Sequence, residues 1–277
     1  METADLLTTV SELPALPHVA SRLFQLLNDP KSGAADVEST ISTDPGLVAN
    51  VLQLANSGFF ARRRKITSIR DAVVLLGLKR VTDVAMCSMF AAVLPARLPA
   101  YGFRARDFHL HCLAVAAISE HVATARGQRQ PAFLFSAALL HDIGKLALAA
   151  FFQKTQPDRI DGELIETTAG ERTAFGLDHA EIGEAAIAQW KLPPSFAAVA
   201  RWHHEPDQDP HNDYALLIDI VHVADALAHR FGFGSSGVQA QRDEPIADRL
   251  RPSEEQINQI AEETIDQIRE LERILHD

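Results

Sequence analysis

The chain has 277 residues, 47% of them hydrophobic, which is enough to build one large domain or two smaller ones. Its formal net charge of −11 and pI of about 5.5 argue against a general nucleic-acid binder, which would normally present a basic face. The only cysteines, Cys87 and Cys112, lie in apolar stretches without a CxxC partner, so we expect no disulfide framework and a reducing compartment.

Neither a secretory signal nor a membrane span is expected. Residues 1–9 lack a basic region followed by an apolar one. The longest apolar run, residues 133–152, is interrupted by histidine, aspartate and lysine, so it should not cross a membrane. We therefore expect a cytoplasmic protein.

The first hundred residues show helical periodicity and no period-two alternation long enough to require a strand. Asp44 followed by Pro45 is typical of a helix start, and Thr67 or Ser68 can cap the helix that Gly77 ends. Helices are predicted over residues 17–28, 34–42, 45–56, 69–76 and 80–93. This part of the chain is predicted to be entirely helical.

One dense basic cluster, Arg62-Arg63-Arg64-Lys65, interrupts this part of the chain. A solvated loop is one interpretation of it, and a contact with an anion or a partner protein is the other.

Four short motifs of the first hundred residues resemble, in order and spacing, the N-terminal lobe of HDOD proteins, the "HD-related output domain" family. The motifs are Leu13-Pro14-x-Leu16-Pro17, Asp44-Pro45-Gly46-Leu47, Leu54-Ala55-Asn56-Ser57, and Ala72 through Leu76-Gly77. The resemblance implies a bundle of about five helices packed onto a second, HD-type helical lobe. It also implies a role in bacterial signalling with signalling proteins as partners, often without demonstrated enzymatic activity.

His141 and Asp142 stand inside the apolar run of residues 133–152, most of which reads as a buried helix. Two ionisable groups are costly to bury there unless something compensates them. The pair is either hydrogen-bonded in the core or coordinates a divalent cation, for which imidazole and carboxylate are both suitable ligands.

Further ligand types recur on the helices predicted around this pair. Asp178 and Glu181 form a capping-box pattern that fixes His179 in the first turn of a helix. The full succession is His111, His141, Asp142, His179, His203, His204 and Asp225. With each group on its own helix, such a set can surround two cations, and Asp142 would bridge them. Fe, Mn, Ni and Zn all remain open as the two divalent metal ions.

The same succession is similar to the H…HD…D signature of the HD-domain phosphohydrolases and to the extra histidines of their HD-GYP branch. That resemblance implies a first metal held by His111, His141, Asp142 and Asp225, and a second held by Asp142, His179, His203 and His204. Lys145 matches the lysine of HD-x-G-K, which would contact a phosphate; a solvated lysine is the alternative. Asp107 is either a ligand of a third metal or a helix N-cap. His109 and His121, away from the face of His111, should be exposed or locally bonded.

The chain departs from the HD-GYP pattern after Glu205, where Pro206-Asp207-Gln208 replaces the Gly-Tyr-Pro loop. Activity on cyclic di-GMP is therefore not implied. Two hypotheses remain. One is a metal-dependent phosphohydrolase in which Asp142 and Lys145 are the catalytic groups and the ligand is a phosphorylated small molecule or nucleotide. The other is a non-catalytic interaction module whose metal is structural or absent.

The predicted fold is all-α, a two-lobed helical bundle. We expect an HDOD lobe at residues 1–100, an HD-type metal-binding lobe at 101–232, and a linker with a C-terminal amphipathic helix at 233–277. Ser253 with Gln256 can open that last helix. It either covers the body of the protein or forms a homodimer.

Overall fold

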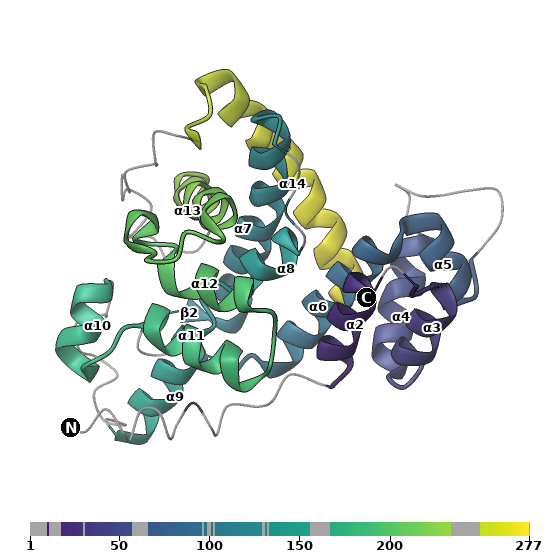
Figure 1. The fold of residues 1–277 in the computed structure, drawn as a ribbon, viewed down its shortest axis with the longest axis horizontal. Coiled ribbons are helices and arrows are strands. Elements are labelled where there is room, and N and C mark those ends of the chain that lie inside the picture. The colour runs from purple at the N-terminus through teal and green to yellow at the C-terminus, as the bar shows by residue number, and fades with distance from the viewer. Residues whose placement is uncertain are drawn as a thin grey trace. The chain divides into compact units, whose positions relative to one another are not determined.

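The computed structural model describes residues 10, 18–29, 31–56, 66–95, 97–98, 101, 103–128, 131, 133–155, 167–233 and 250–276. They are almost entirely helical, which confirms the all-α class (Figure 1). The chain divides into two compact units, residues 1–14 with 94–268, and residues 15–93 with 269–277. The motif at residues 13–17, the basic cluster at 62–65 and most of the predicted connector at 231–245 lie outside the described residues.

The unit of residues 15–93 and 269–277 contains the helices predicted from the N-terminal pattern. They are α2 (His18–Asn28), α3 (Ala34–Ile41), α4 (Pro45–Ala55), α5 (Ile69–Leu76) and α6 (Leu78–Val93). The expected caps are present, because the Asp44 carboxylate accepts from the first amides of α4 and the Ser68 hydroxyl accepts from the Asp71 amide of α5. Asn56 ends α4, and its side-chain amide pairs with both backbone groups of Ile66 at 2.8 Å.

The unit of residues 1–14 and 94–268 holds the remaining elements. They are β1 (Arg97–Leu98), β2 (Phe103–Arg104), α7 (Ala105–Ala125), α8 (Leu134–Leu139), α9 (Gly144–Thr155), α10 (Thr168–Phe175), α11 (His179–Gln189), α12 (Pro194–Trp202), the 3₁₀ turn η2 (Pro206–Gln208), α13 (Ala215–Arg230) and α14 (Glu254–His276), which belongs to this unit up to Ile268. The antiparallel pair β1–β2 was not expected, since two residues a strand leave no alternation to detect.

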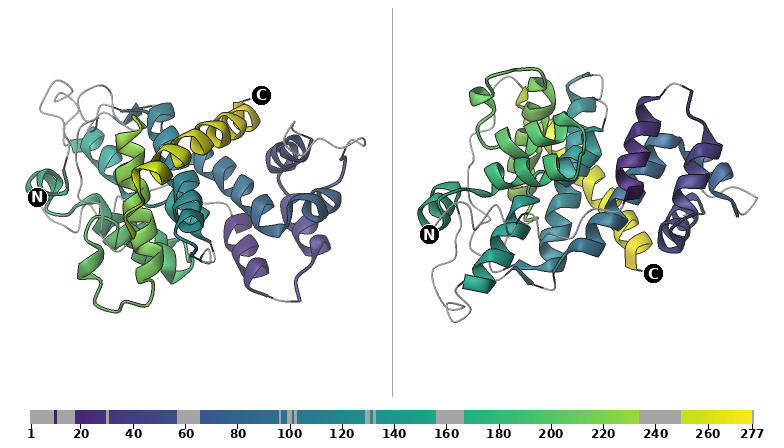
Figure 2. Two further views of the ribbon diagram at one scale, coloured as in Figure 1. Left: turned by 90° about the horizontal axis from the view of Figure 1, so that it is seen from above. Right: turned by 60° about the horizontal axis from the view of Figure 1, so that its bottom comes forward.

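Helix α7 is the central element of this larger unit. Helices α13 and α8 pack against it, while α11 packs against α9 and α12, as the two views of Figure 2 also show. The 113–118 stretch of α7 and the 220–228 stretch of α13 are buried on nearly every side, which explains their alanine- and valine-rich composition. Helices that are apolar all round in this way bring the few polar groups they carry into the interior.

The sequence suggested that most of the apolar run of residues 133–152 forms one helix, but the structure divides it into two. Helix α8 ends at Leu139 and α9 begins at Gly144, and residues 140–143 form tight turns with bonds such as His141 N to Ala138 O. His141 and Asp142 therefore lie in a break between two helices. Among the described residues, the stretch Leu134–Lys154 is long and apolar enough to cross a membrane, but 89% of its apolar 18-residue window is buried within the protein.

Two other boundaries differ from what the sequence predicts. The charged composition of residues 153–176 predicts an irregular stretch, but α10 lies within it, capped by Thr167 and ended by Gly176 in the left-handed conformation. The sequence also predicts a helix over residues 196–204, whereas α12 starts at Pro194 and ends at Trp202, so His203 occupies its C-cap and His204 follows it. Proline at the first helical position fits this earlier start, because its missing N–H is unpaired there in any helix.

Helix α14 lies beside α7 (Figures 1 and 2). Polar side-chain contacts join the two helices. The predicted capping box is present, with Gln256 N donating to Ser253 Oγ and Ser253 N donating to Gln256 Oε1. Gln256 also donates to Ala125 O, and His121 Nδ1 lies 2.9 Å from Glu263 Oε2. The apolar face of α14, with Ile257 and Ile260, is buried within the chain, which favours the covering role over dimerisation.

Helices α9 and α11 approach each other closely where α9 begins. A Cβ added to Gly144 would lie 1.9 Å from the carbonyl oxygen of His179 and 2.7 Å from the Gly183 amide nitrogen, so both neighbours are backbone atoms that cannot rotate away. A Cβ added to Gly183, opposite, would meet the Ala200 Cβ at 3.3 Å, a tight contact that a shift of a few tenths of an ångström relieves. Only a glycine at 144 allows α9 and α11 to pack at this distance.

We predict that Gly144→Ala lowers the free energy of unfolding by at least ~3 kcal/mol, the upper range for overpacking, because α9 and α11 must separate. Gly183→Ala is the matched control and should change it by less than ~1 kcal/mol, since helix propensity offsets a mild contact. Urea unfolding followed by circular dichroism measures both. Equal stability of the two variants would contradict the packing described.

Candidate metal centre

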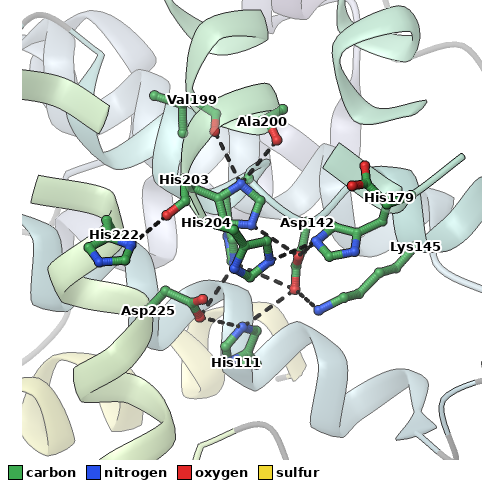
Figure 3. A network of polar contacts seen from close by, with 12 residues as sticks. His111, Asp142, Lys145, His179, Val199, Ala200, His203, His204, His222 and Asp225 are labelled. Carbon is green, nitrogen blue, oxygen red and sulfur yellow. Dashed lines mark hydrogen bonds and ion pairs between the residues drawn. The ribbon is translucent and has the colours of Figure 1, made fainter. Parts of the chain in front are cut away.

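The structure brings together all seven side chains that the sequence singled out as ligands. Figure 3 shows Asp142 at their centre, with imidazoles from α7, from α11 and from the end of α12 directed toward it. The imidazole of His141, from the α8–α9 turn, also approaches Asp142. Three overlapping groups place one donor atom of each member within 4.8 Å of the others: Asp142, His179, His203 and His204; His111, His141 and Asp142; and His141, His203 and Asp225. Except for the half-buried His204, all of these residues are buried.

The two carboxylate oxygens of Asp142 face two different sets of imidazoles. Oδ2 lies 3.6 Å from His111 Nε2 and 3.5 Å from His141 Nε2. Oδ1 lies 3.1 Å from His179 Nε2 and 3.7 Å from His203 Nε2. One carboxylate thus separates the ligand atoms into two clusters, which is the arrangement of a group that bridges two cations.

Asp225 and His204 complete the two clusters. Asp225 Oδ1 lies 3.2 Å from His111 Nε2 and 3.7 Å from His141 Nε2, on the side of Asp142 Oδ2. His204 Nε2 lies 3.0 Å from His179 Nε2, on the side of Asp142 Oδ1. The first cluster is therefore carboxylate-rich, and the second consists mostly of imidazole.

Hydrogen bonds at Nδ1 orient three of the rings so that Nε2 points inward. His141 Nδ1 donates to Ala138 O at 2.8 Å, and His203 Nδ1 donates to Ala200 O at 3.0 Å. His179 Nδ1 donates to Glu171 Oε2 at 2.7 Å. A ring that donates from Nδ1 keeps a lone pair on Nε2 when neutral, and this is the form that binds metal.

Several of the inward-facing atoms make no hydrogen bond within the described part of the chain although they are fully buried. They are Nε2 of His111, His141 and His203, together with Asp142 Oδ1 and Asp225 Oδ1. Buried polar atoms are rarely left unsatisfied, because each unpaired group costs about 1–3 kcal/mol. Nitrogen and carboxylate oxygen atoms that converge in this way fit divalent cations of the Fe, Mn, Ni or Zn type.

Electrostatics in the cluster follow from burial and from the two carboxylates. Burial lowers the pKa of His141 to about 3. Burial acts on His111 in the same direction, but Asp142 and Asp225 raise its pKa to about 9. Against the opposing effect of burial, Lys145 and the histidines hold the pKa of the Asp142 carboxyl well below its usual range. The positive charges of protonated His111 and Lys145 thus balance the ionised carboxylates. A metal cation bound in this cluster would displace the proton of a ligating imidazole.

Lys145 is directed at the same carboxylate. Its Nζ lies 2.5 Å from Asp142 Oδ2, and 14% of its side chain is exposed. Despite its burial, the neighbouring Asp142 raises the pKa of Lys145 above the usual value, so the amine stays charged. The alternative of a freely solvated lysine does not describe this position.

Asp107, considered as a third-metal ligand or as an N-cap, is not the N-cap of α7. It lies in the first turn of α7, where Arg104 holds the N-cap position and bonds both of its oxygens at 2.8 and 3.0 Å. It belongs to none of the ligand groups found among the described residues. His109 is buried rather than exposed, and His121 is half-buried against Glu263.

The structure adds polar residues that the sequence did not identify. Glu171, on α10, bonds His179, and Tyr101, just before β2, bonds Glu171 at 2.7 Å. His222 donates from Nδ1 to the carbonyl oxygen of His203 at 2.7 Å. His229 Nε2 lies 3.5 Å from Asp225 Oδ1 and forms a further group with Asp225 and His111. Its spacing, one helical turn after Asp225, was a usable signal; Glu171 and Tyr101 offered none.

Solved structures with this fold cover the whole chain. An HDOD domain protein of unknown function from Geobacter sulfurreducens is 25% identical, with a TM-score of 0.70 over 100% of this chain and 99% of that one. A presumed phosphohydrolase from Shewanella amazonensis is 27% identical, with a TM-score of 0.68 over 98% of each chain.

An uncharacterized protein of Treponema pallidum is 25% identical over 236 residues. The match spans 80% of this chain but 43% of the relative, so less than half of that longer protein is represented. Residues 13–206 match the sequence profile of the HDOD domain, a stretch that runs from the first N-terminal motif to the residues that follow His203 and His204. The chain therefore belongs to the HDOD domain family.

Proposed function

We propose that this HDOD protein is a regulatory protein of signal transduction whose larger unit binds two divalent cations. With these cations it hydrolyses a phosphate ester bond in a nucleotide or in a phosphodiester. The observation that carries the proposal is the division of the Asp142 oxygens between two sets of imidazoles. The likeness to a presumed phosphohydrolase from Shewanella amazonensis supports the same reaction class.

Each side chain has a definite part in this proposal. His111, His141 and Asp225 would hold one cation, His179, His203 and His204 the other, and Asp142 both. Two cations in such a centre supply an activated water and a clamp for phosphoryl oxygens. Lys145 carries a fixed positive charge and is partly open to solvent, so its amine can bind a phosphoryl oxygen of the substrate.

A second candidate is a non-catalytic module that presents its surface to signalling partners. Lys145 favours it, because in this structure the amine bonds the Asp142 carboxylate and is thereby occupied. The short turn η2 after His204, in place of a Gly-Tyr-Pro loop, favours it as well. Cation binding without hydrolysis of any phosphomonoester, phosphodiester or nucleotide tested would support this candidate over the first.

We predict that Asp142→Asn removes both cations, because an amide offers one weak donor oxygen in place of two charged ones. Elemental analysis of purified protein should find two cations per wild-type chain, and cation affinity should fall at least ~100-fold in the variant, beyond the range for outer-shell changes. Asp107→Asn is the matched control and should retain both. Full cation content in Asp142→Asn would refute the proposed centre.

We predict that Lys145→Met retains the cations but lowers kcat/KM for a phosphorylated substrate roughly 10–100-fold, the equivalent of one charge-assisted hydrogen bond. Lys154→Met, on the exposed end of the same helix, should leave kcat/KM unchanged. Steady-state hydrolysis of a generic phosphodiester measures both. An unchanged rate in Lys145→Met would exclude a role for the amine in substrate binding.

A further inference from the structure

Glu171 is a buried carboxylate that no ligand motif of the sequence contains. It lies on α10 with 1% of its surface exposed. Its Oε2 accepts from the backbone N of His179 at 2.8 Å and from His179 Nδ1 at 2.7 Å, while its Oε1 accepts from the Tyr101 hydroxyl at 2.7 Å. Burying a charge of this kind is costly, so its partners need to compensate it.

Capping alone does not account for this carboxylate. The first turn of α11 already has a complete capping box, in which Asp178 accepts from Glu181 N and Glu181 accepts from Asp178 N. A residue needed only to satisfy a free amide could remain at the surface, where the cost of burial is absent. The bond to the ring nitrogen of His179 is the contact that a capping role leaves unexplained.

The bond from Nδ1 determines what the other ring nitrogen can do. With Nδ1 as the donor, the neutral ring of His179 has its lone pair on Nε2, and Nε2 lies 3.1 Å from Asp142 Oδ1 and 3.0 Å from His204 Nε2. A carboxylate behind a ligating imidazole also makes the inner nitrogen a stronger donor to metal. Two other inward rings use backbone carbonyls for this bond: His141 uses Ala138 and His203 uses Ala200.

Tyr101 holds the second oxygen of Glu171 and connects it to Lys145. Tyr101 is 7% exposed, and the Lys145 amine lies 5.9 Å from the centre of its ring, within the range of a cation–π contact. Tyr101 thus contacts both Glu171, which bonds His179, and the charged amine of Lys145, which bonds Asp142.

We propose that Glu171, held by Tyr101, is a positioning residue that fixes His179 as an Nε2 donor and thereby sets the affinity of the second cation, the one assigned to Asp142, His179, His203 and His204. This inference rests on the proposed dinuclear centre and adds to it an outer layer from α10 and from the segment before β2. The layer contacts the second cluster directly, at His179, whereas it reaches Asp142 Oδ2 on the side of the first cluster through Lys145. We therefore expect its effect to fall mainly on the second cation.

The test is cation binding by calorimetry, with Mn²⁺ or Co²⁺ added to metal-free wild type and variants. Glu171→Gln keeps an acceptor for the ring N–H but loses the charge, and we expect the second cation to bind ~10–100-fold more weakly while the first binds as in wild type. Tyr101→Phe should show the same selectivity with a smaller loss. Glu184→Gln, on an exposed face of α11, should bind both cations as wild type does.

Visible absorption of the Co²⁺ forms distinguishes positioning from general loss of structure, because it reports the ligands of each site separately. The Glu171→Gln spectrum should match that of His203→Ala, which loses a ligand of the second site, and differ from that of His111→Ala. If Glu171→Gln bound both cations with wild-type affinity, or bound both more weakly to the same extent, the positioning role of Glu171 would be overturned and the proposed centre would stand. Fewer than two cations in the wild-type chain would instead overturn the proposed centre.

Discussion

The constraint on which the larger unit depends is the burial of negative charge in an apolar interior. Asp142 is 1% exposed and Asp225 is 2% exposed, in surroundings made of alanine, leucine, valine and isoleucine. A buried carboxylate without compensation costs several kcal/mol. Among the lysines and arginines of the described residues, Lys145 forms an ion pair with Asp142. The imidazoles therefore carry the remaining compensation, either as protonated rings or as fellow ligands of a cation. Nε2 of His111, His141 and His203 makes no hydrogen bond within the described part of the chain, and these atoms are suited to a cation.

The same constraint explains the break between α8 and α9. In a continuous helix, His141 and Asp142 would be separated by about 100° around the axis, so only one of them could face a given point. The turn at residues 140–143 directs both side chains to the same centre, and Gly144 lets the new helix start directly against the backbone of His179. A local departure from the most favourable secondary structure thus serves the site, and glycine makes it compatible with close packing.

How much of this the sequence could predict follows from the physical origin of each signal. Helix starts with side-chain caps, at Asp44, Ser68 and Asp178, were identified correctly because the cap and the helix are adjacent in the chain. The convergence of the seven ligand positions was also predicted, since histidine and aspartate stand out in apolar helices. The break at residues 140–143 was missed because its composition is helical, and its cause lies in a tertiary contact with α11. Glu171 was missed because a glutamate in a charged stretch looks solvated, and only packing makes it buried.

This difference between visible and hidden residues bears on what an intact ligand motif means in a chain of this family. The motif reports the atoms that would touch a cation, whereas the strength of binding also depends on what holds those atoms in place. The rings of His141, in the first cluster, and His203, in the second, are held by carbonyl groups three residues earlier in the chain. In the second, His179 depends on α10 and on the segment before β2, which follow no pattern along the chain. Two chains with identical ligand sets can therefore differ in how firmly the ligand atoms of the second cluster are held, and with it in their affinity for a cation.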